Sequence, residues 1–214
     1  MWILTESHPE FAPEVGYERV AVSAQAPDRR NGECWVAVWI RQEIQATGLA
    51  LVGEPERTAA ARIDLGAGRS LVVFGTVLPW RGDIRHPGYR GARAFERALV
   101  AQAADWDRAL ADHRSVELCI AGDFNQELSA EGPVGTRAGR HALQRVLIER
   151  SLRCVTSGDA DPLIARGWRE NIDHVVLSQG LRATQSMATI WPEQFPLPTN
   201  LSDHHGICVQ LADA

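Results

Sequence analysis

The sequence predicts an α/β sandwich built from mixed sheets. Most apolar segments are short, rich in β-branched residues and bounded by turn residues, as strands are, while few have the 3.6-residue apolar period of a helix. Several strand segments follow one another directly, which favours mixed sheets over a regular alternation of strands and helices. With 214 residues the chain is long enough for one large domain, and we expect residues 1–214 to form it.

The predicted strands share one pattern, an apolar run between turn residues. In chain order they are residues 2–5, 17–24, 34–40, 58–65, 71–78, 116–121, 172–178, 183–190 and 207–211.

The predicted helices have apolar residues that recur on one face. Phe95, Leu99, Gln102, Trp106 and Ala109 share a face of the first predicted helix, residues 93–113. Leu143, Leu147 and Ile148 do so in the second, residues 141–152. The segments 79–91 and 191–200 are expected to be loops, and loops of such a fold carry its chemistry.

The charge of the chain argues against a protein that coats nucleic acid without selectivity. Its formal net charge is -5 and its pI is near 5.8, whereas nonspecific duplex binding depends on clustered basic residues. The sequence has one local basic concentration, which suits the backbone of a nucleic acid or, more plainly, the solvated flank of a helix. Its members are Arg81, Arg85, Arg90, Arg93 and Arg97.

Cysteine usage and hydropathy indicate a reducing, aqueous compartment. Cys34, Cys119, Cys154 and Cys208 are far apart, form no C-x-x-C pair and lie in or beside apolar runs, so we expect buried free thiols. The first residues include no basic leader, and no apolar run approaches the ~20 residues of a membrane span. We therefore expect a soluble, cytoplasmic protein with no membrane span.

A first polar cluster follows the predicted buried strand 116–121. Gly122 lets the chain turn, so Asp123 and Asn125 are expected to project toward the same side. A carboxylate can take a proton from water while an amide donates to a charged oxygen, which is the division of labour that ester hydrolysis requires. An Asx turn that caps a loop is the structural alternative.

A second cluster begins the predicted strand 172–178. Asp173 leads this strand, where a carboxylate can hold a distant imidazole in one tautomer and favour its cationic form. The alternative for Asp173 is a buried salt bridge. For the neighbouring His174, a core or surface imidazole with its hydrogen bonds satisfied is the favoured interpretation.

The remaining polar candidates lie near the two ends of the sequence. Asp203 and His204 precede the last predicted strand, where Asp203 offers a hard oxygen ligand for Mg²⁺ or Mn²⁺ and His204 can stabilise charge on a phosphoryl oxygen. Glu6 follows the first apolar run and offers the same class of ligand. A zinc site through His205 is the alternative, but adjacent histidines point apart in an extended chain and no third ligand lies nearby in sequence.

Taken together, these segments resemble the signature of the endonuclease/exonuclease/phosphatase superfamily, related to DNase I and exonuclease III. The matching motifs are Ile3-Leu4-Thr5-Glu6, Gly122-Asp123-Phe124-Asn125, Ile172-Asp173 and Ser202-Asp203-His204. The resemblance implies a four-layer α/β/β/α sandwich whose two mixed sheets face each other, with the site at one end.

The resemblance also implies a role for each polar residue. Glu6 would be the principal ligand of a Mg²⁺ or Mn²⁺ ion, with Asp203 beside that metal. Asp123 would align or deprotonate the attacking water, with Asn125 as its neighbour on the phosphate. His204, oriented by Asp173, would contact the phosphoryl oxygen.

Two features depart from the family pattern. Family members usually begin with one more strand, which carries an Asn, so we expect the sandwich to lack the usual first strand. Val77 stands where a phosphate-binding His or Tyr is common, and a valine side chain can neither donate a hydrogen bond nor carry charge. Phosphate contact would then fall to other residues near this strand. The candidates are Thr76, Trp80, Arg81 and His86.

The sequence therefore predicts a Mg²⁺- or Mn²⁺-dependent phosphoesterase. It would hydrolyse a phosphodiester or phosphomonoester by in-line attack of water, and a nuclease acting on DNA or RNA is slightly favoured over a phosphatase. The alternative is a noncatalytic or weakly active binding member of the same fold, because of the missing strand and Val77.

Overall fold

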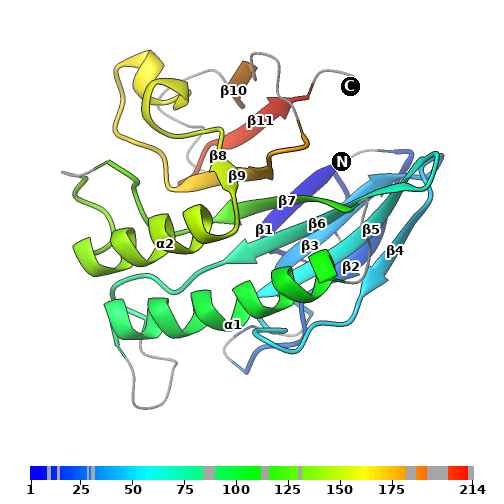
Figure 1. Cartoon of the computed structure of the whole chain (residues 1–214), viewed down its shortest axis with the longest axis horizontal. Helices are drawn as coiled ribbons and strands as arrows, with labels where there is room; N and C mark the ends of the chain where they lie inside the picture. The colour runs from blue at the N-terminus through cyan, green and yellow to red at the C-terminus, as the bar shows by residue number, and fades with distance from the viewer. Residues whose placement is uncertain are drawn as a thin grey trace.

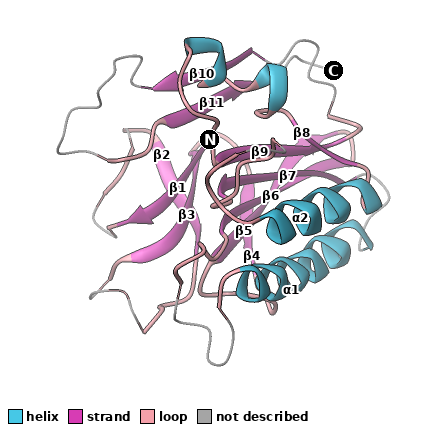
Figure 2. Cartoon of the chain, turned by 90° about the vertical axis from the view of Figure 1, so that its left-hand side faces the viewer, coloured by secondary structure: helices cyan, strands magenta, loops and turns pink. Residues whose placement is uncertain are grey.

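The computed structural model describes most of the chain. The described residues are 1–8, 11–13, 15–27, 29, 32–83, 90–111, 116–129, 132–181, 187–191 and 202–211. They form a six-stranded sheet, a three-stranded sheet, a separate strand pair and two α-helices (Figures 1 and 2).

The elements follow one another in an order close to the predicted one. The strands are β1 (Trp2–Ser7), β2 (Tyr17–Val22), β3 (Cys34–Arg41), β4 (Ala46–Leu49), β5 (Thr58–Gly66), β6 (Arg69–Val77), β7 (Val116–Asp123), β8 (Leu152–Cys154), β9 (Asp173–Ser178), β10 (Met187–Trp191) and β11 (Gly206–Gln210). The helices are α1 (Ala92–Ala111) and α2 (Arg137–Glu149), with short 3₁₀ turns at η1 (Gly158–Ala160) and η2 (Ile164–Arg166).

The six-stranded sheet has the order β4-β5-β6-β7-β9-β8. Only β6 and β7 pair in parallel within it, and the other neighbours are antiparallel. Both helices cover one face of this sheet (Figure 2), where Trp106 of α1 and Leu143 of α2 pack with Phe74 of β6. The predicted helical stripe at Phe95, Leu99 and Trp106 is buried in this core, as expected.

The other face of the six-stranded sheet packs against the three-stranded sheet, whose order is β1-β3-β2. Val36, Val38 and Ile40 of β3 point into this second core and meet Ala59 and Val73 of the larger sheet. The predicted α/β sandwich of mixed sheets is therefore confirmed.

The described part of the chain contains three of the four expected layers, namely the two α-helices, the six-stranded sheet and the three-stranded sheet. The alternation of β3 places Ala37 and Trp39 on the outer face of the three-stranded sheet, and the Arg19 guanidinium lies 5.8 Å from the Trp39 ring. No described α-helix covers that face, because both α-helices pack on the opposite sheet.

Strand β1 lies at the edge of its sheet. Its only partner among the described strands is β3, and β10 and β11 pair with each other rather than with β1. In the part of the chain that the structure describes, the other side of β1 therefore has no paired strand.

The four cysteines are free, as expected, but their burial differs. Cys34 and Cys119 are buried, Cys154 is half-buried and Cys208 is exposed, so the prediction of burial is wrong for Cys208. The reason is that β11 turns alternate residues toward solvent and Cys208 falls on that side. None of the helices in the described ranges is long and apolar enough to cross a membrane.

Candidate active site

The sheet registers bring the predicted polar residues of β7 and β9 together at one edge. In β6 and β7, Val77 stands opposite Asp123, and in β7 and β9, Asp123 stands opposite Asp173. Residues directly opposite one another across a sheet have Cβ atoms only about 5 Å apart. The carboxylates of Asp123 and Asp173 therefore lie close together, where β6 and β7 end and β9 begins.

Gly122 permits the close approach of β6 and β7 just before Asp123. Its φ of 139° suits glycine, and a Cβ at this position would lie 2.1 Å from the carbonyl oxygen of Thr76. The expectation that the chain turns at Gly122 is wrong, because Gly122 lies inside β7 and is paired with Thr76 of β6 and His174 of β9. A glycine is needed here for the close approach of β6.

Asn125 holds the Asp123 carboxylate in place. The Asn125 backbone N–H donates to Asp123 Oδ1 at 2.8 Å, and its side-chain Nδ2 donates to Asp123 Oδ2 at 2.7 Å and to the carbonyl of Leu78 at 3.0 Å. The first of these bonds is the Asx turn that the sequence offered as an alternative. The turn and the candidate function thus coexist, and the Asn125 amide is directed at Asp123.

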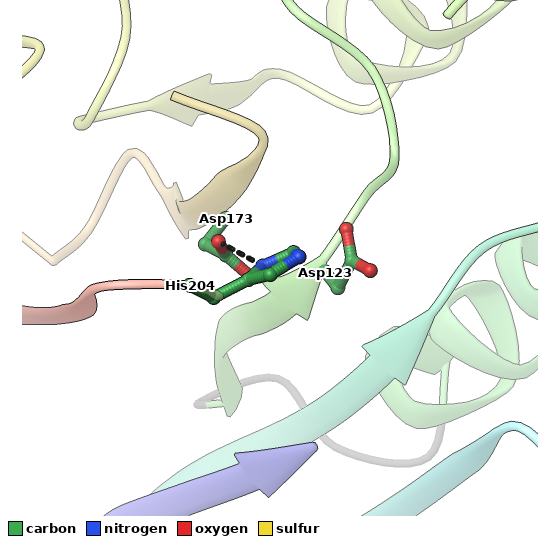
Figure 3. A group of neighbouring side chains, drawn as sticks. All are labelled: Asp123, Asp173 and His204. Carbon is green, nitrogen blue, oxygen red and sulfur yellow. Dashed lines mark hydrogen bonds and ion pairs between the residues drawn. The ribbon is translucent and has the colours of Figure 1, made fainter. Parts of the chain in front are cut away.

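His204 approaches this sheet edge from the segment before β11. Its Nδ1 lies 2.8 Å from Asp173 Oδ2, and its backbone N–H donates to the Ser202 hydroxyl at 3.0 Å. Figure 3 shows the imidazole between the carboxylates of Asp173 and Asp123. Each of the three side chains offers an atom within 4.8 Å of the others.

The electrostatics of the cluster favour a charged imidazole beside a proton-accepting carboxylate. The hydrogen bond that His204 donates to Asp173, together with the charges of the nearby carboxylates, outweighs burial and raises the pKa of His204 to about 9. Burial, followed by the charge of Asp173, raises the pKa of Asp123 to about 7, although His204 and the Asn125 N–H act in the opposite direction. Near neutral pH, the site thus holds an imidazolium next to a carboxyl group that exchanges its proton.

Glu6 and Asp203, the two predicted metal ligands, flank this cluster. The negative charge of Glu6 contributes to the raised pKa of Asp123, and that of Asp203 contributes to the raised pKa of His204. Both side chains are exposed, and Glu6 has a left-handed φ of 52° near the end of β1. Neither belongs to the tight group of Asp123, Asp173 and His204.

The donor set fits a hard divalent cation better than zinc. Glu6 and Asp203, which flank the cluster, offer the carboxylate oxygens that Mg²⁺ and Mn²⁺ prefer. Zinc sites are instead built mainly from histidine and cysteine ligands, and this cluster of described residues holds one histidine and no cysteine.

The four residues predicted to contact phosphate differ in their exposure to solvent. Thr76 is 0% exposed, and its hydroxyl donates to Gln102 Oε1 at 2.6 Å inside the helix-covered core, so it offers no surface to a substrate. Trp80 and Arg81 are exposed on the turn after β6. His86 lies outside the described residues. Val77 is buried between the sheets, as its apolar side chain requires.

His174 and His205 stand apart from the candidate chemistry. His174 is buried, its Nε2 lies 2.9 Å from the Gln126 carbonyl and its Nδ1 lies 3.4 Å from the Thr156 hydroxyl. The interpretation of His174 as a core histidine with its hydrogen bonds satisfied is thus confirmed. His205 stacks on Trp168 with ring centroids 4.8 Å apart.

Sequence reasoning missed one charged residue at the site. Arg29 Nη2 lies 2.6 Å from Glu6 Oε2, and the Arg29 side chain is only 14% exposed. Arg29 precedes β3 in a polar segment with no periodicity and no motif, so the sequence contained no signal for this contact.

Comparisons with known proteins agree with the fold. The profile of the Endonuclease/Exonuclease/phosphatase family matches residues 7–204. No curated protein matches the chain.

Solved structures share the fold across nearly the whole chain at low sequence identity. A 3′ phosphatase, NExo, from Neisseria, bound to a product DNA hairpin, has a TM-score of 0.64 and 16% identity over 97% of this chain and 86% of that one. An AP endonuclease from Archaeoglobus fulgidus has a TM-score of 0.62 and 17% identity over 98% and 86%. The endonuclease domain of TRAS1, a telomere-specific non-LTR retrotransposon, has a TM-score of 0.62 and 10% identity over 98% and 83%.

The family match spans most of the chain and includes Asp123, Asp173 and His204, and the fold that these structures share serves nucleases and phosphatases. This chain belongs to the endonuclease/exonuclease/phosphatase family.

Proposed function

We propose that this protein is a divalent-metal-dependent phosphoester hydrolase, and that its substrate is a nucleic acid. The observation that carries the proposal is the cluster of Asp123, Asp173 and His204, in which an acceptor of protons and a charged imidazole meet at one sheet edge. Family membership and the fold support phosphoester chemistry at this edge.

In this proposal, each side chain of the cluster has one task. Asp123 accepts a proton from the attacking water, and its raised pKa makes it a stronger base than an ordinary aspartate. Asn125 fixes the direction of that carboxylate through two hydrogen bonds. His204, held by Asp173, donates a hydrogen bond to the phosphoryl oxygen on which charge develops.

Glu6 and Asp203 would hold a Mg²⁺ or Mn²⁺ ion, which would supply a positive charge that polarises the phosphoryl group. The protein itself must orient the attacking water, which is the task of Asp123 and Asn125. No covalent intermediate on the protein is required for hydrolysis by this arrangement.

Exposed arginines favour a nucleic acid over a small phosphoester. Arg81, Arg90, Arg93 and Arg97 are all exposed and follow β6, the strand whose end lies beside Asp123. A stretch of arginines next to a hydrolytic site attracts a phosphate backbone more strongly than a single phosphate group.

A comparison of substrates tests this preference. We expect a higher kcat/KM for an oligonucleotide than for p-nitrophenyl phosphate, and oligonucleotide binding that weakens steeply as salt increases. Substituting both Arg93 and Arg97 by Ala should reduce the slope of log K against log salt by about 1 for each lost phosphate contact. The matched control, Arg145→Ala on the exposed face of α2, should leave the slope unchanged. A flat salt response would instead indicate a small phosphoester as the substrate.

A noncatalytic binding protein is the second candidate, and Val77 is the observation that favours it. Val77 stands opposite Asp123 in the register and is 1% exposed, so it adds no phosphate contact at the centre of the site. This candidate predicts oligonucleotide binding without turnover in the presence of Mg²⁺ or Mn²⁺.

A further inference from the structure

Arg29 is fixed next to Glu6 by more than their ion pair. The Arg29 backbone N–H donates to the carbonyl of Ala26, which is buried between the sheets, and Gln25 Nε2 donates to the Arg29 carbonyl. The Arg29 guanidinium carbon lies 3.4 Å from the centroid of the Trp35 ring, a distance typical of close stacking. The side chain is thus held in place from its backbone to its charged end.

The tryptophan that supports Arg29 is itself held firmly. Trp35 belongs to β3 and is 5% exposed, and the Arg57 guanidinium carbon lies 4.5 Å from its ring centroid. Arg57 forms a buried ion pair with Asp83, whose side chain is 0% exposed. This network, consisting of Arg29, Trp35, Arg57 and Asp83, connects the Glu6 carboxylate to the inside of the sandwich.

The ion pair places a positive charge where the proposed metal ligand needs its negative charge. Arg29 Nη2 approaches Glu6 Oε2 at 2.6 Å, so the guanidinium competes for the oxygen that a divalent cation would take. In addition, the Nε of Arg29 is buried and has no hydrogen-bond partner among the residues that the structure describes. If a cation displaces Arg29 from Glu6, the Nε–H of Arg29 is thus a donor that is still able to form a hydrogen bond.

We propose that Arg29 is a positioning residue that sets the affinity of the site for its divalent cation, by holding Glu6 in an ion pair that the cation must displace. This inference rests on the proposed function, because it takes Glu6 as a metal ligand. The ion pair neutralises Glu6 in the metal-free protein and offsets the repulsion between Glu6 and the raised-pKa carboxylate of Asp123. Metal-free protein is thereby stabilised, and cation binding is weakened.

The test is the affinity of the substrate-free protein for Mn²⁺, measured by electron paramagnetic resonance of the free ion and by calorimetry. Arg29→Met removes the guanidinium and its charge and leaves an unbranched apolar side chain beside Trp35. We expect the Kd for Mn²⁺ to fall on the order of tenfold, because a positive charge within a few ångströms of the cation is lost. Arg29→Lys keeps the charge and should stay nearer to wild type.

Two further variants show whether the effect passes through Glu6. In a Glu6→Gln background, Arg29→Met should change the Kd much less, since the carboxylate for which Arg29 and the cation compete is absent and only the direct repulsion between the two cations is removed. The matched control is Arg19→Met, which removes the same charge from an arginine over Trp39 on the outer face of the same sheet. This control should change the Kd less than about twofold, because exposed charges far from the cation are screened by salt.

The outcomes separate the inference from the proposed function. In one outcome, wild type binds Mn²⁺ and hydrolyses a phosphoester while Arg29→Met binds Mn²⁺ with equal or lower affinity. That result would overturn the inference that Arg29 competes with the cation, and the proposed hydrolase function would stand. If wild type binds no divalent cation, the proposed function fails and this inference fails with it. Arg29→Gln provides the same comparison should Arg29→Met not fold.

Discussion

Asp123→Asn is expected to abolish most of the hydrolytic activity while stabilising the metal-free protein. The turnover number for bis-p-nitrophenyl phosphate should fall by about 10²- to 10⁴-fold, since Asn cannot accept the proton of the attacking water. Stability should rise because wild type buries a carboxylate whose pKa is raised to about 7 by desolvation and by the charges of Asp173 and Glu6. Activity and stability would thus change in opposite directions, as expected at a functional site.

The pH dependence of the stability gain follows from the direction of the pKa shift. The pKa of Asp123 rises from 3.8 in the unfolded chain to about 7 in the folded one, so ionising this carboxyl group costs more in the folded protein. This cost is absent at a pH below the unfolded-state pKa of 3.8, grows as the pH rises from 3.8 to about 7, and reaches its full size above the folded-state pKa of about 7. Asn has no such cost at any pH.

Urea denaturation in the presence of a chelator measures this difference. At pH 8 we expect Asp123→Asn to be more stable than wild type by on the order of 2 kcal/mol, less than the full linkage value because the bond from Asn125 Nδ2 is lost. At pH 5 the gain should be smaller. The control, Asp159→Asn, removes an exposed carboxylate and should change little. A variant less stable than wild type at pH 8 would contradict the account.

His204→Gln and Asp173→Asn are expected to have large and non-additive effects on hydrolysis. Glutamine cannot carry the positive charge that His204 holds next to Asp173, so we expect a loss of about 10²- to 10⁴-fold in kcat. Asp173→Asn acts through His204, so the double variant should be little worse than His204→Gln alone. The control, His141→Gln, removes an exposed imidazole on α2 and should retain activity.

A titration of His204 by NMR tests the role of Asp173 without turnover. In metal-free wild type the His204 ring should titrate near 9, because Asp173 accepts its hydrogen bond and stabilises its charge. In Asp173→Asn the pKa should move down toward the ordinary value of 6.5. A His204 pKa that stays near 9 in this variant would show that Asp173 does not orient or charge the imidazole.

Sequence patterns were sufficient for those parts of the fold and site that depend on regular strands. Asp123 and Asp173 each lie at the end of an apolar run, and strand pairing then places such ends at one sheet edge. The motif with His204 precedes the last strand in the same way. Short, half-exposed β4 and three-residue β8 were not predicted, because so few residues provide no clear apolar period.

The remaining site features depend on contacts that a sequence does not encode locally. Thr76 was a predicted phosphate contact, but alternation along β6 turns Thr76 toward the helices and Val77 toward the opposite sheet. The hydroxyl instead pairs with Gln102, which explains a polar residue on the predicted buried face of α1. The contact between Arg29 and Glu6 joins the segment before β3 to strand β1, and only the folded chain brings these two segments together.

The most direct test of the account is the hydrolysis of bis-p-nitrophenyl phosphate by chelator-treated wild type and by His204→Ala, each with and without added Mn²⁺. We expect wild type to be inactive after chelation and to regain turnover when Mn²⁺ is added, whereas His204→Ala should stay inactive in both conditions. Turnover in His204→Ala equal to that of wild type, or no turnover by wild type with Mn²⁺ or Mg²⁺, would contradict the claim that Asp123, Asp173 and His204 form a phosphoester-hydrolysing site.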